Sequence, residues 1–149
     1  MEAALTALVS LFNAGKADLP DGALQKNCIF RLNGRAYHEH LGRPPGDPLV
    51  RLIGCGPAGY RFILTALRYA MDRPRLEVHA THRSERHGVE SAGLLTRRAS
   101  LSGTLRGSEM PFTAECELTL LGDGSGAIRE IAVTMGDPDV ERIVQARRG

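Results

Sequence analysis

The chain has 149 residues, of which 42% are hydrophobic and 24% charged, with a formal net charge of +2 at pH 7. This length predicts a single domain over residues 1–149 that buries its own core without disulfides or metal ions. The small net charge, scattered arginines and 5% aromatic content argue against a nucleic-acid partner. No apolar run has the length of a membrane span and no basic-then-apolar leader opens the sequence, so we expect a cytoplasmic protein without a membrane partner.

The first half of the chain predicts two helices separated by a hairpin. Residues 3–15 place their apolar side chains on one helical face, and Asn13-Ala14-Gly15 ends that helix. Residues 27–32 and 35–41 read as two strands joined by Asn33-Gly34, a pair that favours the tight turn of a hairpin. A proline-rich loop follows, and then a second amphipathic helix from about 57 to 72.

The second half has the period of two that is typical of strands. Four strands are predicted, joined by short turns, at residues 75–87, 92–107, 111–121 and 127–135. Short links between consecutive strands require antiparallel pairing. A short helix over 137–148 closes the chain. The pattern predicts an α+β fold in which helices cover one face of a curved antiparallel sheet.

Residues 54–59 read Gly-Cys-Gly-Pro-Ala-Gly, a GxGxxG motif that resembles the phosphate-binding turn of nucleotide cofactor domains. That turn needs a small residue four positions after its last glycine, where this chain has Ile63, and an acidic residue at the end of the next strand. The strand over 76–82 ends instead in threonine and histidine. We therefore predict no cofactor, and interpret Gly56 as a helix N-cap followed by Pro57 at the first helical position.

Four segments carry a family resemblance, through their order and spacing along nearly the whole chain. They are Leu11-Phe12-Asn13-Ala14-Gly15, Asn27-Cys28-Ile29-Phe30, Gly56-Pro57-Ala58-Gly59-Tyr60-Arg61-Phe62, and Cys116-Glu117-Leu118-Thr119-Leu120 with the later Ile128-Arg129-Glu130-Ile131. In these the chain resembles the nuclear transport factor 2-like superfamily, whose cone-shaped fold includes ketosteroid isomerases and polyketide cyclases. The resemblance implies a hydrophobic pocket between the helices and the concave sheet face, and a homodimer formed through the convex face.

The catalytic residues of the ketosteroid isomerases do not carry over to this chain. Their tyrosine falls at Leu8, their general-base aspartate at Leu32 and their neutral aspartic acid at Cys116. The Arg–Asp pair and second aspartate of the superfamily's epoxide hydrolases are not found either. Because a shared fold does not fix a reaction, any activity must rest on other residues.

Strand parity in the expected hairpin selects the first candidate site residues. A two-residue turn pairs Leu32 with Arg35, Phe30 with Tyr37 and Cys28 with Glu39, so these six share a face. Phe30 and Leu32 then form pocket wall, Tyr37 is a hydrogen-bond donor to a carbonyl or oxyanion, and Glu39 is a catalytic base. The alternative is that Tyr37 and Glu39 are exposed groups at the rim of the hairpin.

The opposite face of the same strand carries His38 and His40. Two imidazoles two residues apart have a usable spacing for metal ligands, and His79 or His82 would add a third. The glycine and glutamate residues expected of a cupin-type metal motif are missing, and this face points away from the pocket. We therefore predict no metal site.

The remaining candidates lie on the later strands and the long helix. His82 ends an apolar stripe and is either a general acid or base or a hydrogen-bonded histidine at the sheet edge. Cys116 and Leu118 alternate inward and form pocket wall, and Tyr60 looks toward the cavity. Arg97 shares a parity with apolar neighbours, so it is either a pocket residue that binds a carboxylate or enolate, or is turned outward by a bulge.

Two classes of function fit these residues. The first is a cofactor-free isomerase, cyclase or dehydratase that performs acid–base chemistry on a hydrophobic, carbonyl-bearing small molecule. The second is a non-catalytic small-molecule-binding or assembly module of the same fold, favoured by the loss of every acid used by related enzymes. The three cysteines have no paired spacing and are expected to be reduced thiols.

Overall fold

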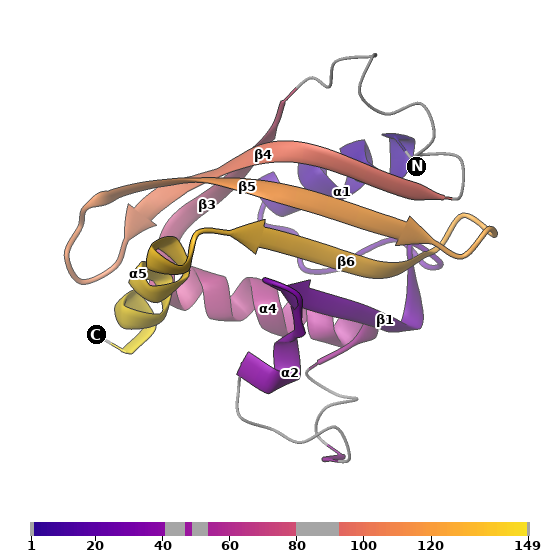
Figure 1. Ribbon diagram of the computed structural model, residues 1–149, viewed down its shortest axis with the longest axis horizontal. Coiled ribbons are helices and arrows are strands. Elements are labelled where there is room, and N and C mark those ends of the chain that lie inside the picture. Colours follow the sequence, from indigo (N-terminus) through magenta and orange to yellow (C-terminus); the bar gives the residue numbers. More distant parts are fainter. Residues whose placement is uncertain (1, 41–46, 49–53, 80–92, 149) are drawn as a thin grey trace.

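The structure is a computed structural model that describes residues 2–40, 47–48, 54–79 and 93–148. Over these residues the chain forms one curved, unclosed sheet of six strands that wraps around helices (Figure 1). The strands run in the order β2-β1-β6-β5-β4-β3. They are β1 (Leu24–Leu32), β2 (Arg35–Ala36), β3 (Met71–Val78), β4 (Leu94–Leu105), β5 (Pro111–Gly122) and β6 (Ile128–Met135). The helices are α1 (Glu2–Asn13), α2 (Tyr37–His40), α4 (Gly56–Ala70) and α5 (Asp137–Arg148).

The expected α+β class and the antiparallel meander from β3 to β6 are confirmed. One pairing that the sequence did not reveal is parallel: β1 lies beside β6, with Ile29 opposite Glu130 and Leu32 opposite Val133. This pairing joins the N-terminal hairpin to the last strand of the meander. The helices then face a continuous concave surface, as Figure 1 shows for α1 and α4.

The expected hairpin is much shorter than its sequence indicated. The turn at Asn33-Gly34 forms and pairs Leu32 with Arg35, but β2 ends at Ala36 and residues 37–40 form the helical turn α2. The predicted pairing of Phe30 with Tyr37 and of Cys28 with Glu39 is therefore wrong. An isolated bridge between Ile29 and Cys55 occupies the edge of β1 along which a longer β2 would have paired.

The GxGxxG motif packs α4 closely onto β1. Cys55 is the N-cap of α4, so the predicted cap at Gly56 is displaced by one residue. Gly56 has φ +65°, and a Cβ atom there would lie 2.3 Å from the carbonyl oxygen of Lys26. A Cβ atom on Gly59 would lie 3.0 Å from the ring of Phe30. Helix packing thus accounts for both glycines, since any larger residue would push the helix off the strand.

The end of α1 is fixed to β3 by one side chain. Asn13 Nδ2 donates to the carbonyl oxygen of Leu76 at 2.9 Å, and the Leu76 amide donates to Asn13 Oδ1 at 2.7 Å. The Asn13 amide thus makes with the strand the two hydrogen bonds that a neighbouring strand would make. This contact sets the position of α1 over the concave face.

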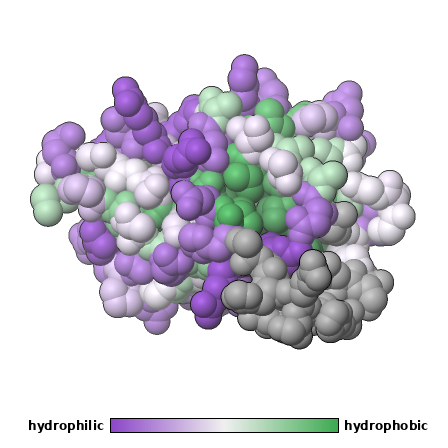
Figure 2. Space-filling model, turned by 90° about the horizontal axis from the view of Figure 1, so that it is seen from above, coloured by the Kyte–Doolittle hydropathy of each residue, from purple (hydrophilic) through white to green (hydrophobic). Residues whose placement is uncertain are grey.

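Apolar side chains from α1, α4 and the sheet form the core. Cys28, at 0% exposure, and Cys116, at 7%, belong to it, and all three cysteines have free thiols. Burial raises the pKa of Cys28 to about 12 and that of Cys116 to about 11. On the outside, polar side chains surround a smaller apolar area (Figure 2). None of the helices in the described ranges is long and apolar enough to cross a membrane.

Replacing Gly56 with alanine tests the contact between α4 and β1. We expect a loss of about 3 kcal/mol in the free energy of unfolding, because both a left-handed backbone and a clash with Lys26 would be introduced. The matched control is Gly22→Ala, where φ is +83° and nothing lies within 4 Å of the new Cβ atom. Urea denaturation measures both. Equal losses in the two variants would show that the close approach of Gly56 to Lys26 does not contribute to the loss in the free energy of unfolding.

The buried thiols predict a loss of stability at alkaline pH. Thiols of the unfolded chain lose their protons near the ordinary pKa of 9.0, while Cys28 and Cys116 keep theirs to about 12 and about 11 in the folded state. The free energy of unfolding should therefore fall as the pH rises above 9, by up to about 1.4 kcal/mol per pH unit for each thiol. Urea denaturation at pH 8 and pH 10.5 measures the fall. A double variant, Cys28→Ala with Cys116→Ala, should lose less between the two pH values, and an equal loss would contradict the assignment.

Candidate functional site

A cavity of about 560 Å³ lies between the concave face of the sheet and the helices. We call it the apolar cavity, because most of its lining side chains are hydrophobic. They come from α1, α4 and α5 on one side and from the strands on the other. Those of α1 are Leu5, Leu8, Val9 and Phe12, those of α4 include Ile63, Ala66 and Leu67, and those of α5 are Val140, Ile143 and Val144.

Strand alternation supplies the opposite wall of the apolar cavity. Phe30 and Leu32 of β1 line it, as do Cys116 and Leu118 of β5, each pair two residues apart on one face. The thiol of Cys116 stays protonated because burial raises its pKa, so it serves as wall and not as a nucleophile. Leu8, Leu32 and Cys116, where the sequence resemblance places the catalytic residues of the ketosteroid isomerases, all line this cavity.

Tyr60 is the deeply buried polar group of the cavity. Its side chain lines the cavity from the first turns of α4 and the residue is 6% exposed. Among the described residues its hydroxyl group has no hydrogen-bond partner. Burial raises its pKa, against a smaller lowering by Arg68, so the phenol stays neutral and can donate a hydrogen bond. A buried hydroxyl without a partner costs about 1–3 kcal/mol, so a hydrogen bond to a ligand atom that reached it would be favourable.

Tyr37 lines the cavity from α2 and is half-buried. Its ring meets the ring of Phe62 edge-on, with centroids 6.2 Å apart and planes at 66°. This contact packs the Tyr37 ring against α4. The structure thus brings Tyr37 to the cavity as expected, although from a helical turn and not from a strand.

His40 also lines the cavity, contrary to its assignment by strand parity. Its ring is exposed and its Nε2 atom lies 2.7 Å from the carbonyl oxygen of Leu32. A carbonyl oxygen only accepts hydrogen bonds, so Nε2 is the donor in this contact, and a neutral imidazole in this tautomer has its lone pair on Nδ1. His38 and His40 share a helical turn and not a strand face. No group of three His, Cys, Asp or Glu residues is placed to hold a metal ion in the part of the chain that the structure describes.

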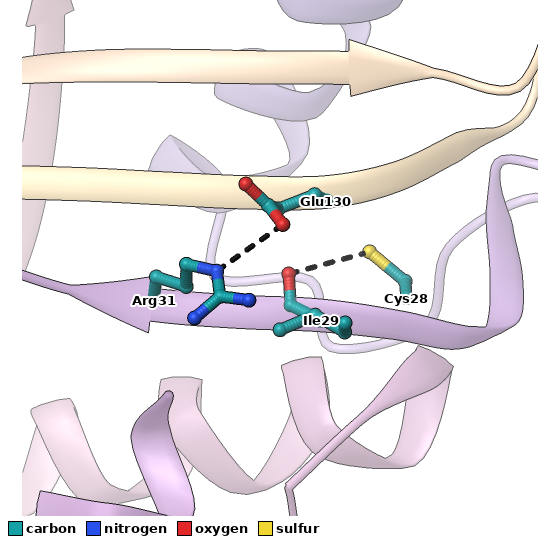
Figure 3. Close-up of polar contacts among 4 residues, drawn as sticks. All are labelled: Cys28, Ile29, Arg31 and Glu130. Carbon is teal, nitrogen blue, oxygen red and sulfur yellow. Dashed lines mark hydrogen bonds and ion pairs between the residues drawn. The ribbon is translucent and has the colours of Figure 1, made fainter. Parts of the chain in front are cut away.

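Arg31 is a second cavity residue that strand parity placed on the opposite face. Its Nε atom lies 3.2 Å from Glu130 Oε1 on the neighbouring strand β6 (Figure 3). In the same view the Cys28 thiol donates a weak hydrogen bond to the Ile29 carbonyl oxygen at 3.9 Å. The arginine therefore adds a cation at the wall whose charge is balanced by Glu130. From the sequence, only the length of the arginine side chain could have indicated that Arg31 reaches the cavity, since long side chains can extend around the edge of a strand.

The other expected site residues lie elsewhere. Glu39 is exposed, does not line the cavity and forms an ion pair with Arg35 at 3.5 Å, one helical turn away. Arg97 faces the same side as its cross-strand partner Leu118, and β4 pairs with β5 without a register shift, so the expected bulge is wrong. Its side chain is 10% exposed and forms an ion pair with Glu2 of α1, and Arg97 does not line the cavity. His82 lies outside the described residues.

Comparison with known proteins finds similarity in structure alone. No family model and no curated protein matches the sequence. A ketosteroid isomerase-like protein from Catenulispora acidiphila, solved with trimethylamine, aligns over 87% of this chain and 82% of its own, with TM-score 0.60 and 11% identity. An NTF2-like protein of unknown function from Exiguobacterium sp. 255-15 aligns over 90% and 98%, with TM-score 0.61 and 14% identity.

A third similar structure is that of a pinacolase, BvnE, from Penicillium brevicompactum. It aligns over 98% of this chain and 89% of its own, with TM-score 0.66 and 10% identity. Identities this low show a shared fold, whereas activity must be argued from the site. The chain has the cone fold of the nuclear transport factor 2-like and ketosteroid isomerase-like proteins.

Proposed function

We propose that this chain is a cofactor-free enzyme that performs acid–base chemistry on a hydrophobic, carbonyl-bearing small molecule, as an isomerase, cyclase or dehydratase does. The observation that carries the proposal is the buried hydroxyl of Tyr60, a residue that lines the apolar cavity and whose hydroxyl has no partner among the described residues. An apolar ligand fills such a cavity favourably, and its oxygen atom satisfies the phenol. A neutral phenol there is a preorganised donor for a carbonyl oxygen.

The proposed reaction begins with removal of a proton from the carbon next to the carbonyl group. Tyr60 donates to the carbonyl oxygen and stabilises the negative charge that develops on it, and Tyr37 is a second donor at the cavity edge. His40 is the base that we favour among the described residues, because its Nδ1 atom keeps a lone pair and its ring lines the cavity. The proton is then returned to another atom of the substrate or lost with a leaving group. Glu39 and His82 remain alternative bases.

A related fold supports this class of reaction without fixing it. The similar BvnE structure is that of a pinacolase, an enzyme of the same fold. The alternative is a non-catalytic binding module, and the observation favouring it is that Leu8, Leu32 and Cys116 stand where related isomerases carry catalytic groups. The homodimer and the cytoplasmic location expected from the sequence stay predictions.

A pair of neutral probes tests the role of Tyr60. The native protein should bind 2-acetylnaphthalene more tightly than 2-ethylnaphthalene, which lacks the carbonyl oxygen, by about tenfold or more. In Tyr60→Phe this preference should disappear. The same variant without ligand should be more stable than the native protein by about 1 kcal/mol, because the unpaired hydroxyl is gone.

The matched control for this test is Tyr69→Phe, which removes a hydroxyl from the same helix at a residue that is 70% exposed. It should keep the preference for the ketone. Fluorescence titration measures binding and urea denaturation measures stability. An unchanged preference in Tyr60→Phe would remove the phenol from the site.

Proton exchange distinguishes an enzyme from a binding module. In D2O the native protein should accelerate the exchange of the methyl protons of bound 2-acetylnaphthalene, as followed by proton NMR. His40→Ala and Tyr60→Phe should each slow this exchange by about 100-fold, the lower end of the range for a general acid or base.

His79→Ala is the control for the base, because His79 contacts Ser100 at 2.9 Å and does not line the cavity. The variants Glu39→Gln and His82→Ala are measured beside it. If one of these abolishes exchange while His40→Ala does not, the base is reassigned. If the native protein binds the ketone without accelerating exchange, the chain is a binding module.

A further inference from the structure

A second hollow of about 590 Å³ lies at the end of the molecule where α1 and α4 end and β3 begins. We call it the arginine groove, because four arginine residues line it and Asp72 is the one acidic residue among its described lining residues. The local excess of positive charge is larger than the net +2 of the whole chain. The four arginines are Arg68, Arg73, Arg75 and Arg106.

Two of these guanidinium groups are held in place by backbone carbonyl groups. Arg68 Nη2 donates to the carbonyl oxygen of Gly15 at 2.5 Å, and Arg106 Nε donates to that of Arg68 at 2.6 Å. Gly15 allows this approach, because a Cβ atom there would lie 1.9 Å from Arg68 Nη2. Each guanidinium has five N–H donors, so most of them remain available beyond these contacts. The groove thus presents donors whose positions are fixed before any ligand arrives.

The other two arginines lie on a distorted segment of β3. Arg73 has φ +51°, a left-handed conformation that is uncommon for residues other than glycine, and it falls at the register shift between Asp72 and Arg75. Strained backbone of this kind concentrates at functional sites. In the described part of the chain no carboxylate forms an ion pair with the guanidinium of Arg73 or Arg75. The strained segment thus adds two unneutralised cations to the groove.

We propose that the arginine groove binds the phosphate group of a small molecule. A phosphate carries up to two negative charges and offers several oxygen atoms, so it can engage several guanidinium groups at once, whereas a carboxylate fits a single fork. The proposal does not depend on the acid–base function proposed above. The two sites are nevertheless neighbours, because Phe12 lines both the groove and the apolar cavity.

Calorimetric titration with inorganic phosphate and with phenyl phosphate, at constant ionic strength, tests the groove. Arg73→Gln and Arg75→Gln should each weaken binding by at least about fivefold. The control is Arg129→Gln, which removes an exposed arginine of β6 that does not line the groove. It should bind phosphate as the native protein does.

Thermal unfolding supplies a second readout that does not need activity. Without phosphate, Arg73→Gln and Arg75→Gln should melt at the native temperature or above it, because repulsion among the arginines is reduced. A given concentration of phosphate should raise their melting temperature less than it raises that of the native protein. Three results would overturn the proposal: no binding of millimolar phosphate to the native protein, equal weakening in Arg129→Gln, or acetate binding as tight as phosphate binding. The first would show that the groove takes no anion, the second that the attraction is not localised to the groove, and the third that it is not specific for phosphate.

Discussion

The close contact between α4 and β1 sets the geometry on which the rest of the molecule depends. Gly56 and Gly59 bring the helix against the Lys26 carbonyl group and the Phe30 ring, at distances that no side chain would allow. The next residue, Tyr60, is thereby placed in the wall of the apolar cavity. A motif that resembles a nucleotide-binding turn therefore acts here as a packing device, and the buried Tyr60 follows directly after it in sequence.

Local patterns were enough to predict the meander, both long helices and much of the cavity wall. Period-two alternation in β5 correctly placed Cys116 and Leu118 inward, because that strand is buried on one face and exposed on the other. Contacts between distant segments could not be predicted in this way. The parallel pairing of β1 with β6 and the bridge from Ile29 to Cys55, on the edge of β1 where a longer β2 would pair, are of this kind.

The errors over Glu39 and His40 follow from that shortened hairpin. Strand parity holds only for an extended chain, in which side chains alternate between two faces. Beyond Ala36 the chain is helical, and successive side chains are rotated by about 100° about the helix axis. Glu39 therefore faces its ion-pair partner Arg35, while His40 turns to the cavity. Strand parity correctly predicts the side of β4 on which Arg97 lies. Its ion pair with Glu2 depends on how α1 packs against the sheet, and local sequence patterns do not show this.

The contact of Asn13 with Leu76 has a consequence for how copies of the chain can associate. An outer strand with free amide and carbonyl groups invites another chain to add to the sheet, which is a common route to aggregation. β3 is the outer strand at its end of the sheet, and the Asn13 amide already occupies the donor and acceptor of Leu76. A neighbouring chain that approached this edge would first have to displace α1. The same helix end that positions the cavity wall thus also protects the sheet against growth at this border.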